Sequence, residues 1–294
     1  MEHIEGVVSS TLLSSAIKWI TEHSECPDPK LEPEFDIDDQ VRRYAKKLRK
    51  LTEFDTSFWG DWVEQSGIKK LAGMRLSKPF LLKHATFIKR TTDESYIPLH
   101  QDIVSWEYPF RTGITIWVAL TDCRKEHGGL FYLPNDSTIH EHVLDLRYPS
   151  FKCLTPEFAK GVRWDQLRDL EANAGDVLIW PGHTAHGSRE KLVGGLRIAM
   201  PFVYVEETEF YKFMEQNMDT WVRANLEDLL GEKMVASETV DDHLRHLTNH
   251  SLKMVTFLAR FKRHFGYGPK IVDFIASPNL QTLLCDAATT YVRK

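Results

Sequence analysis

The chain has 294 residues, of which 42 % are hydrophobic and 27 % charged, an ordinary composition for a globular protein with a large core. Its net charge is −5 and its basic residues are scattered, so we expect no nucleic-acid partner. The acidic start lacks a signal-peptide pattern, and no apolar run reaches the roughly 20 residues that cross a bilayer, so we expect a cytoplasmic protein with no membrane contact. The four cysteines are widely spaced and include no C-x-x-C pair, so we expect free thiols.

The first part of the chain, residues 1–75, is predicted to be mainly helical. Residues 10–22 and 38–52 have the spacing of amphipathic helices. In the second of these, apolar side chains recur at i, i+3, i+4 and i+7, at Val41, Tyr44, Ala45 and Leu48.

A β-rich part follows, over residues 76–205, as short apolar runs between turn residues. Many short strands at this spacing predict a sandwich or jelly roll. Within it, residues 145–172 are an expected insertion with a short helix near Trp164 to Leu170, of the kind that covers a pocket. The predicted strands are 80–89, 98–103, 113–120, 129–133, 176–180, 183–188 and 196–205.

The last part, residues 206–294, is again predicted to be helical. One apolar stripe comprises Met254, Phe257, Leu258, Phe261 and Phe265. We expect this helix to pack on the β core, although a dimer contact or a cover over the active site is the alternative. The whole chain is thus predicted to be a single α+β domain with a mainly β core, either a monomer or a homodimer.

Two potential metal ligands stand close together in Pro98-Leu99-His100-Gln101-Asp102. Residues two apart on a strand share a face, with Cα atoms roughly 6.5–7 Å apart, so one imidazole and one carboxylate can reach the same metal. The best third ligand is His186, which follows a Gly-Asp turn and the apolar run Val177 to Trp180. Its neighbour His183 is the competing candidate.

The spacing after His186 suggests what the metal does. If residues 184–188 and 195–199 pair as a hairpin, Arg197 stands opposite His186. Two histidines and a carboxylate occupy one face of Fe(II) and leave three open positions. 2-Oxoglutarate can fill two of them and O2 the third, while Arg197 binds the distal carboxylate bidentately and Ser188 donates a further hydrogen bond.

These stretches resemble the phytanoyl-CoA dioxygenase family of Fe(II)/2-oxoglutarate oxygenases. The resemblance implies a double-stranded β-helix, iron ligands His100, Asp102 and His186, and a co-substrate site with Ser188 and Arg197. It also implies that Trp117, and less directly Lys83, contact the co-substrate. Family members commonly carry Pro-Gly-Ser-His where this chain has Pro134 to Ser137, and nothing carries over to residues after 206. The motifs are Leu99 to Asp102, Ile114 to Leu120 with Asp122, Glu126 to Leu130, Gly175 to Trp180, and His186 to Ser188 with Arg197.

The resemblance also bears on the reaction. Related halogenases have Gly or Ala where this chain has Asp102, so a carboxylate there favours hydroxylation of a small molecule. The breadth of the family makes a substrate of specialised biosynthesis the expectation. Desaturation, demethylation and epoxidation use the same ligands and stay open. Other classes are a non-catalytic jelly-roll binding protein and a zinc or nickel cupin, which usually lacks the distal arginine. Candidate substrate contacts are Trp106, Tyr108, Trp180 and His183.

Overall fold

The fold is described from a computed structural model of the chain, which divides into two compact units, Met1–Glu207 and Thr208–Lys294. The boundary lies close to residue 206, where the helical C-terminal part is predicted to begin. The structure describes residues 1–35, 44–91, 96–106, 110, 112–144, 152–231, 239–265, 269–277, 279–280 and 283–284.

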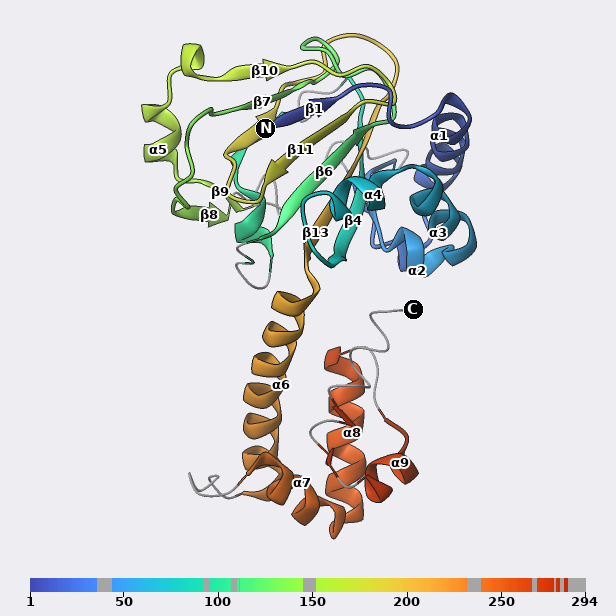
Figure 1. The fold of residues 1–294 in the computed structure, drawn as a ribbon, viewed down its shortest axis with the longest axis vertical. Helices are drawn as coiled ribbons and strands as arrows, with labels where there is room; N and C mark the ends of the chain where they lie inside the picture. Colours follow the sequence, from blue (N-terminus) through green and yellow to red (C-terminus); the bar gives the residue numbers. More distant parts are fainter. Residues whose placement is uncertain are drawn as a thin grey trace. The chain divides into compact units, whose positions relative to one another are not determined.

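Antiparallel strands form the centre of the first unit (Figure 1). The larger sheet has the order β1-β11-β6-β13-β4-β3-β2, the second has the order β10-β7-β12-β5, and β8 pairs with β9. Strands of the larger sheet are β1 (Glu2–Ile4), β2 (Glu34–Phe35), β3 (Ala45–Arg49), β4 (Pro79–Lys89), β6 (Ile114–Ala119), β11 (Val177–Pro181) and β13 (Arg197–Glu206). The remaining strands are β5 (Ile97–His100), β7 (Leu130–Tyr132), β8 (His142–Leu144), β9 (Lys152–Leu154), β10 (Arg168–Leu170) and β12 (His186–Ser188).

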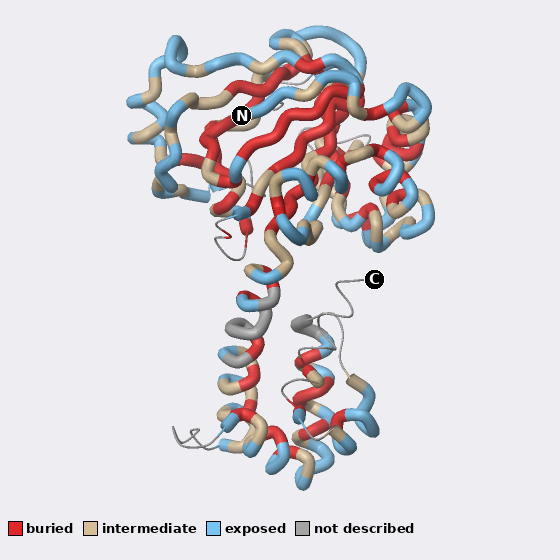
Figure 2. The backbone as a smooth tube through the Cα atoms, in the orientation of Figure 1, coloured by how far each residue is buried: buried red, intermediate tan, exposed pale blue. Residues whose placement is uncertain are grey.

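Side chains alternate between two environments along the central strands of the larger sheet. In β6, Ile116 and Val118 join a core with the N-terminal helices, whereas Trp117 and Ala119 pack in a second cluster with Leu130 of the smaller sheet. Both faces are therefore covered, and Figure 2 shows these strands buried along most of their length. This two-sided burial explains why the strands are almost continuously apolar in the sequence.

The N-terminal helices cover one face of the larger sheet through aromatic side chains. They are α1 (Ser10–Ser24), α2 (Leu51–Phe54), α3 (Thr56–Gln65) and α4 (Ile68–Gly73). The Ser9 side chain caps α1 by accepting a hydrogen bond from the Leu12 amide. Trp62 stacks on Phe202 of β13 with ring centroids 6.1 Å apart, which joins α3 to the sheet. The predicted helix over residues 10–22 is confirmed.

The predicted helix over residues 38–52 is wrong for Ala45–Arg49, although residues 51–52 do begin the helix α2. Residues 36–43 lie outside the described residues, and Ala45–Arg49 is strand β3, paired with β4. The Leu48 amide donates a hydrogen bond to Thr86 Oγ1 at 3.1 Å. Ala45 and Leu48 are fully buried, as the helical stripe requires, but the open edge of β4 supplies hydrogen bonds that override the helical periodicity.

Two further expectations about the β core need correction. Asp102 does not share a strand with His100, because β5 ends at His100 and Asp102 opens the 3-10 turn η2 (Asp102–Ser105). In the expected insertion 145–172, residues 145–151 are not described, and Arg168–Leu170 is not helical but is strand β10, paired with β7. The insertion also holds the helix α5 (Pro156–Gly161) and the 3-10 turn η3 (Trp164–Gln166).

The second unit consists of helices with their own core. Its helices are α6 (Glu207–Leu230), which starts at the unit boundary, α7 (Val240–Thr248), α8 (Ser251–Phe265) and α9 (Ile271–Ala276). Met254, Phe257, Leu258 and Phe261 of the predicted stripe are buried, and they cluster with residues of α6, α7 and α9. The stripe thus fills a core of this unit, which corrects the expectation that it packs on the β core. Among the described helices of both units, none is both long and apolar enough to span a membrane.

Gly187 lies in β12 between the neighbouring strands β5 and β7, where a side chain does not fit. A Cβ atom there lies 2.6 Å from the Ile97 carbonyl oxygen and 2.6 Å from Phe131 Cζ. We predict that Gly187→Ala lowers the free energy of unfolding by about 1–3 kcal/mol, because the strand backbone has to shift. Thermal or chemical denaturation measures this.

Gly194→Ala is the matched control, since a Cβ atom at Gly194 meets nothing within 4 Å. Equal stability of the two variants contradicts the tight packing of β12.

Candidate functional site

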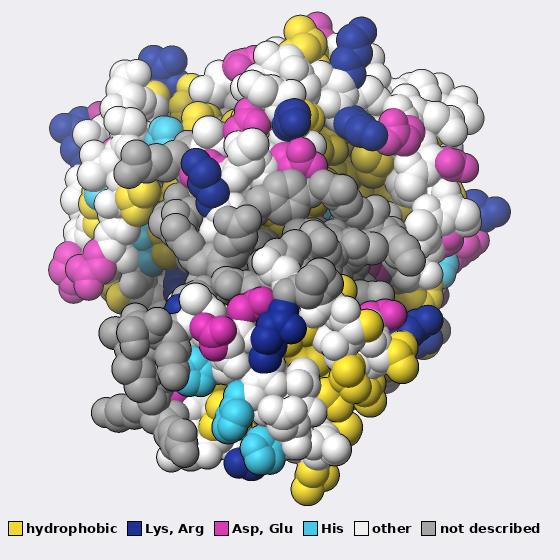
Figure 3. Space-filling model, turned by 60° about the horizontal axis from the view of Figure 1, so that its bottom comes forward, with side chains coloured by type: hydrophobic (Ala, Val, Ile, Leu, Met, Phe, Trp, Pro, Cys, Tyr) yellow, Lys and Arg dark blue, Asp and Glu magenta, His cyan; other side chains and the backbone are white. Residues whose placement is uncertain are grey.

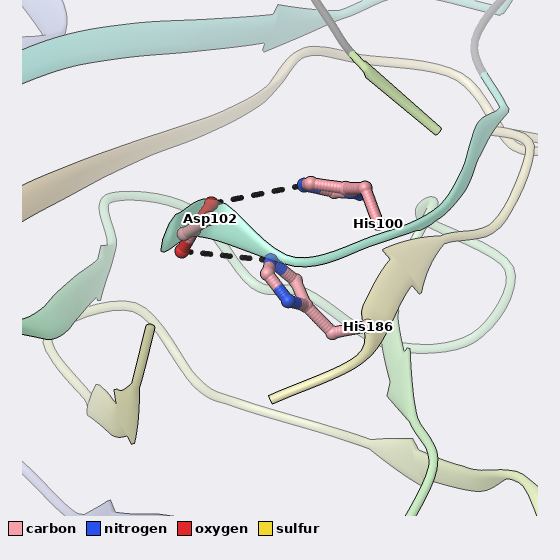
Figure 4. A group of neighbouring side chains, drawn as sticks. All are labelled: His100, Asp102 and His186. Carbon is pink, nitrogen blue, oxygen red and sulfur yellow. Dashed lines mark ion pairs between the residues drawn. The ribbon is translucent and has the colours of Figure 1, made fainter. Parts of the chain in front are cut away.

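His100, Asp102 and His186 lie together in the first unit, although they come from different elements (Figure 4). His100 ends β5 and His186 begins β12, and the pairing of these strands sets the two histidines opposite one another. One ligand atom from each of the three residues lies within 4.8 Å of the others. Among the described residues, these three are the cluster of His, Cys, Asp or Glu side chains that can hold a metal ion. His183 does not belong to it.

The two imidazoles are oriented by their own backbone. His100 Nδ1 hydrogen-bonds to the Pro98 carbonyl and His186 Nδ1 to the Thr184 carbonyl, each at 2.9 Å. An Nδ1–H that donates to a carbonyl leaves the lone pair on Nε2, the arrangement usual for metal-bound histidine. Both Nε2 atoms face Asp102, at 3.8 Å for His100 and 3.9 Å for His186. These distances are too long for hydrogen bonds, so the three side chains converge on a common space.

Asp102 is held in place by two donors on strands of the larger sheet. The Thr115 hydroxyl donates to Asp102 Oδ2 at 2.7 Å, and the Trp180 indole N–H donates to the same oxygen at 3.0 Å. Both donors point to the same side of the sheet as Trp117. Thr115 lies two residues before Trp117 on β6, and Trp180 of β11 is paired with Thr115. Trp180, a predicted substrate contact, is thus buried and orients the carboxylate.

The protonation states of His100 and Asp102 suit a divalent cation. Burial, with a smaller contribution from His186, lowers the pKa of His100 to about 3. Burial alone raises the pKa of Asp102, but His186, His100 and the hydrogen bonds from Thr115 and Trp180 together lower it. Neutral imidazoles and an ionised carboxylate are the forms that bind metals. Two histidine nitrogens and one carboxylate oxygen are a donor set that fits Fe(II).

Arg197 lies at the end of β13 in the larger sheet, and the predicted hairpin with His186 is wrong. Arg197 pairs with Lys89 of β4, whereas His186 pairs with His100 and Tyr132 in the smaller sheet. The chain between β12 and β13 therefore crosses from one sheet to the other, and a short sequence separation does not make two strands neighbours. Arg197, Trp117 and Trp180 nevertheless share the face of the larger sheet that packs toward the smaller one.

Two buried donors near this end of the sheets lack partners among the described residues. They are Arg197 Nε and Ser188 Oγ, on residues that are each 1 % exposed. The Arg197 guanidinium donates one hydrogen bond, to the Gly128 carbonyl at 2.8 Å, and lies 5.4 Å from the Trp117 ring centroid. Buried donors usually have acceptors, so these atoms fit a bound anion such as a carboxylate.

Lys89 is a neighbour of Arg197 that the sequence analysis missed. It is buried, and its Nζ donates to the Arg189 carbonyl at 2.7 Å. Burial and, to a smaller extent, Arg197 hold the pKa of Lys89 well below its usual range. The predicted contact Lys83 lies six residues earlier on β4, about 20 Å away along a strand. Its Nζ donates to the Ser105 carbonyl at 3.1 Å, in the turn that contains Asp102.

The other predicted substrate contacts have different surroundings. Trp106 is buried between two glycines, since a Cβ atom at Gly113 or Gly182 falls 2.1 or 2.2 Å from its ring. His183 is half-buried, and its carbonyl accepts a hydrogen bond from Gln101. Tyr108 lies outside the described residues.

Gln101, between the two ligands on β5 and η2, was also missed. Its buried side chain donates to the Thr138 carbonyl at 2.7 Å and accepts from the His140 amide at 2.9 Å. It thereby ties the segment that carries His100 and Asp102 to a neighbouring loop. The sequence alone does not indicate this role, because these partners of Gln101 lie about forty residues further along the chain.

Solved structures with a similar fold match about seven tenths of the chain. The α-ketoglutarate-dependent epimerase SnoN from nogalamycin biosynthesis is 16 % identical, with a TM-score of 0.52, over 69 % of this chain and 75 % of that chain. AviO1 from Streptomyces viridochromogenes Tue57 is 17 % identical, with a TM-score of 0.53, over 70 % and 89 %. EctD from S. alaskensis is 11 % identical, with a TM-score of 0.57, over 71 % and 73 %. This likeness confirms the predicted double-stranded β-helix.

Two family models match the chain, while a search of curated proteins finds no match. The model described as a phosphopantetheine attachment site matches residues 220–284. The model described as phytanoyl-CoA dioxygenase matches residues 3–199, which is most of the chain and contains all three converging side chains. The chain therefore belongs to the phytanoyl-CoA dioxygenase family and is an Fe(II)- and 2-oxoglutarate-dependent enzyme.

Proposed function

We propose that this enzyme hydroxylates a small-molecule substrate and releases succinate and CO2, with His100, Asp102 and His186 as the iron ligands. The observation that carries the proposal is the convergence of these three buried side chains within 4.8 Å. Bound iron supplies the activation of O2 that is coupled to the decarboxylation of 2-oxoglutarate. The protein has to hold the ligands, bind the co-substrate and keep the site dry.

The ligands are fixed before metal arrives. The backbone carbonyls of Pro98 and Thr184 hold the imidazoles, and Thr115 and Trp180 hold the carboxylate. Loss of such supporting contacts typically lowers metal affinity about 10- to 100-fold. The Trp180 ring, 4.8 Å from that of His186, also shields the site from water.

Arg197 is proposed to bind the distal carboxylate of 2-oxoglutarate. Its unpaired Nε and the hydroxyl of Ser188 supply donors for that carboxylate. The Trp117 ring lies against the guanidinium and limits its movement. The amine of Lys89, which pairs with Arg197 across β4 and β13, is a further nitrogen close to this site.

Asp102 favours hydroxylation among the outcomes open to such enzymes. A carboxylate at this position occupies the coordination site that a halogenase leaves open for chloride, so transfer of a hydroxyl group to the substrate is expected. Desaturation, demethylation and epoxidation use the same three ligands and are the alternative outcomes.

We expect a weak visible charge-transfer band when Fe(II) and 2-oxoglutarate are added to the protein without oxygen. His186→Ala removes the band, because it removes a proposed ligand. His183→Ala is the matched control and keeps it, since His183 lies outside the converging group. A band that survives His186→Ala but not His183→Ala contradicts the ligand assignment.

The same titration tests the co-substrate site without knowledge of the substrate. Arg197→Met retains an apolar side chain of similar length but removes the donors. We expect the Kd for 2-oxoglutarate to rise about 10- to 100-fold, the loss typical of a charge-assisted hydrogen bond. Arg189→Met is the control, because the Arg189 guanidinium pairs with Asp169 instead. An unchanged Kd in a folded Arg197→Met protein refutes the assignment.

A further inference from the structure

The second unit, Thr208–Lys294, is not needed to build the iron site. We propose that it is a carrier domain whose Ser251 bears a phosphopantetheine arm, and that the oxygenase acts on an acyl group held on this arm as a thioester. The part about the acyl group rests on the proposed function, whereas the part about Ser251 stands independently of it.

The match to the phosphopantetheine attachment model falls within one compact unit. It covers residues 220–284, which run from α6 through α9 and beyond. The same segment contains nearly the whole buried cluster of the unit. That cluster comprises Met218, Val222, Leu226, Val240, Leu244, Leu247, Met254, Phe257, Leu258, Phe261, Phe274, Leu280 and Leu284. A unit with its own core can present a modification site without the oxygenase fold.

Attachment of phosphopantetheine needs an accessible hydroxyl group, and Ser251 provides one. Ser251 is exposed and is the first residue of α8. The helix begins with the hydrogen bond that the Met254 amide donates to the His250 carbonyl at 2.9 Å. The Ser251 hydroxyl has no hydrogen-bond partner within the part of the chain that the structure describes. A phosphodiester at this position also benefits from the positive end of the helix dipole.

Other described hydroxyl groups in the matched segment are engaged. Thr239 Oγ1 donates to Asp242, Thr248 Oγ1 to the Arg245 carbonyl, and Thr256 Oγ1 to the Leu252 carbonyl. Ser277 Oγ donates to the Asn279 carbonyl at 2.8 Å. Thr220 opens the segment within α6, away from a helix start, and it has an interaction of its own. Ser251 is therefore the best nucleophile among them.

Exposed apolar side chains follow Ser251 along α8, and further ones lie on α9. Leu252, which follows Ser251, is 81 % exposed, and Val255, one turn further along α8, is 45 % exposed. Three apolar residues of α9, Ile271, Val272 and Ile275, are exposed as well. Figure 3 shows hydrophobic side chains on the surface of the face that it presents. An enzyme that brings coenzyme A to Ser251 therefore meets exposed apolar side chains at the start of α8, which suit protein contact.

The modification is a group transfer from coenzyme A. Ser251 Oγ attacks the phosphorus atom next to pantetheine, a new O–P bond forms, and the pyrophosphate bond breaks. Adenosine 3′,5′-bisphosphate leaves, and a base of the transferase takes the serine proton. The thiol at the end of the arm then displaces the leaving group of an activated acyl donor and forms the thioester.

Tethering explains why both units share one chain. A substrate that is covalently attached to the enzyme is present at a high effective concentration, so the oxygenase needs little intrinsic affinity for it. In the reaction, one atom of O2 enters a C–H bond of the acyl group and the other enters succinate. The substrate and 2-oxoglutarate each lose two electrons, and these four electrons reduce O2.

The first test treats the full-length protein with a broad-specificity phosphopantetheinyl transferase, Mg²⁺ and coenzyme A. We expect intact-mass spectrometry to show the addition of one phosphopantetheine group to the wild type, and peptide mapping to place it on Ser251. Ser251→Ala abolishes the addition, whereas Thr256→Ala, five residues along the same helix, keeps it. No addition to a folded wild type while a known carrier in the same tube is modified, or addition to Ser251→Ala, overturns the assignment.

The second test loads Ser251 from a series of short-chain acyl- and aminoacyl-coenzyme A thioesters. With Fe(II), 2-oxoglutarate and O2, we expect at least one loaded form to gain one oxygen atom and to release succinate at least ten-fold faster than the unloaded protein with the same thioester free in solution. Equal rates, or no stimulation by any loaded acyl group, overturn the tethering. The charge-transfer band of the wild type reports separately on the proposed function, so its absence marks a failure of the iron site instead.

Discussion

The pairing of β12 with β5 is the contact on which the site depends, because it sets His186 opposite His100. β12 comprises only His186–Ser188 and lies between β5 and β7, so its position is fixed from both sides. Gly187 allows this close approach, and the residues on either side of it are a proposed iron ligand and a proposed co-substrate contact. A three-residue strand thus links the chemistry of the metal to that of the co-substrate.

The side chains of the larger sheet alternate between two faces, and each face has its own role in the site formed with β12. One face packs on the N-terminal helices and stabilises the unit. The other face carries Thr115, Trp117, Trp180 and Arg197, which orient the carboxylate and supply the buried cation. The other side chains on the central strands of this sheet are mostly apolar. The few polar groups therefore lie in apolar surroundings, in which hydrogen bonds and charge interactions are stronger than in water.

The sequence was sufficient to predict the β core and the converging group, because ligand spacing and strand periodicity are local features. The predictions were wrong where the pairing of distant strands determines the structure. Ala45–Arg49 has a helical periodicity but forms a strand that pairs with β4. β12 and β13 are close in sequence but belong to different sheets. Lys89 and Gln101 were missed since their roles come from neighbours that are distant in sequence. For the second unit the sequence pattern predicted only helices, because the carrier role proposed for it depends on one exposed serine, Ser251.

The most direct test of the account is a crystal structure of the protein soaked with Fe(II) and 2-oxoglutarate without oxygen, with diffraction collected at the iron edge. The account predicts one strong anomalous peak at bonding distance from His100 Nε2, His186 Nε2 and an oxygen of Asp102, with the distal carboxylate of 2-oxoglutarate on Arg197. An iron peak bound by other side chains, or an empty space between these three in a crystal that binds iron elsewhere, contradicts it.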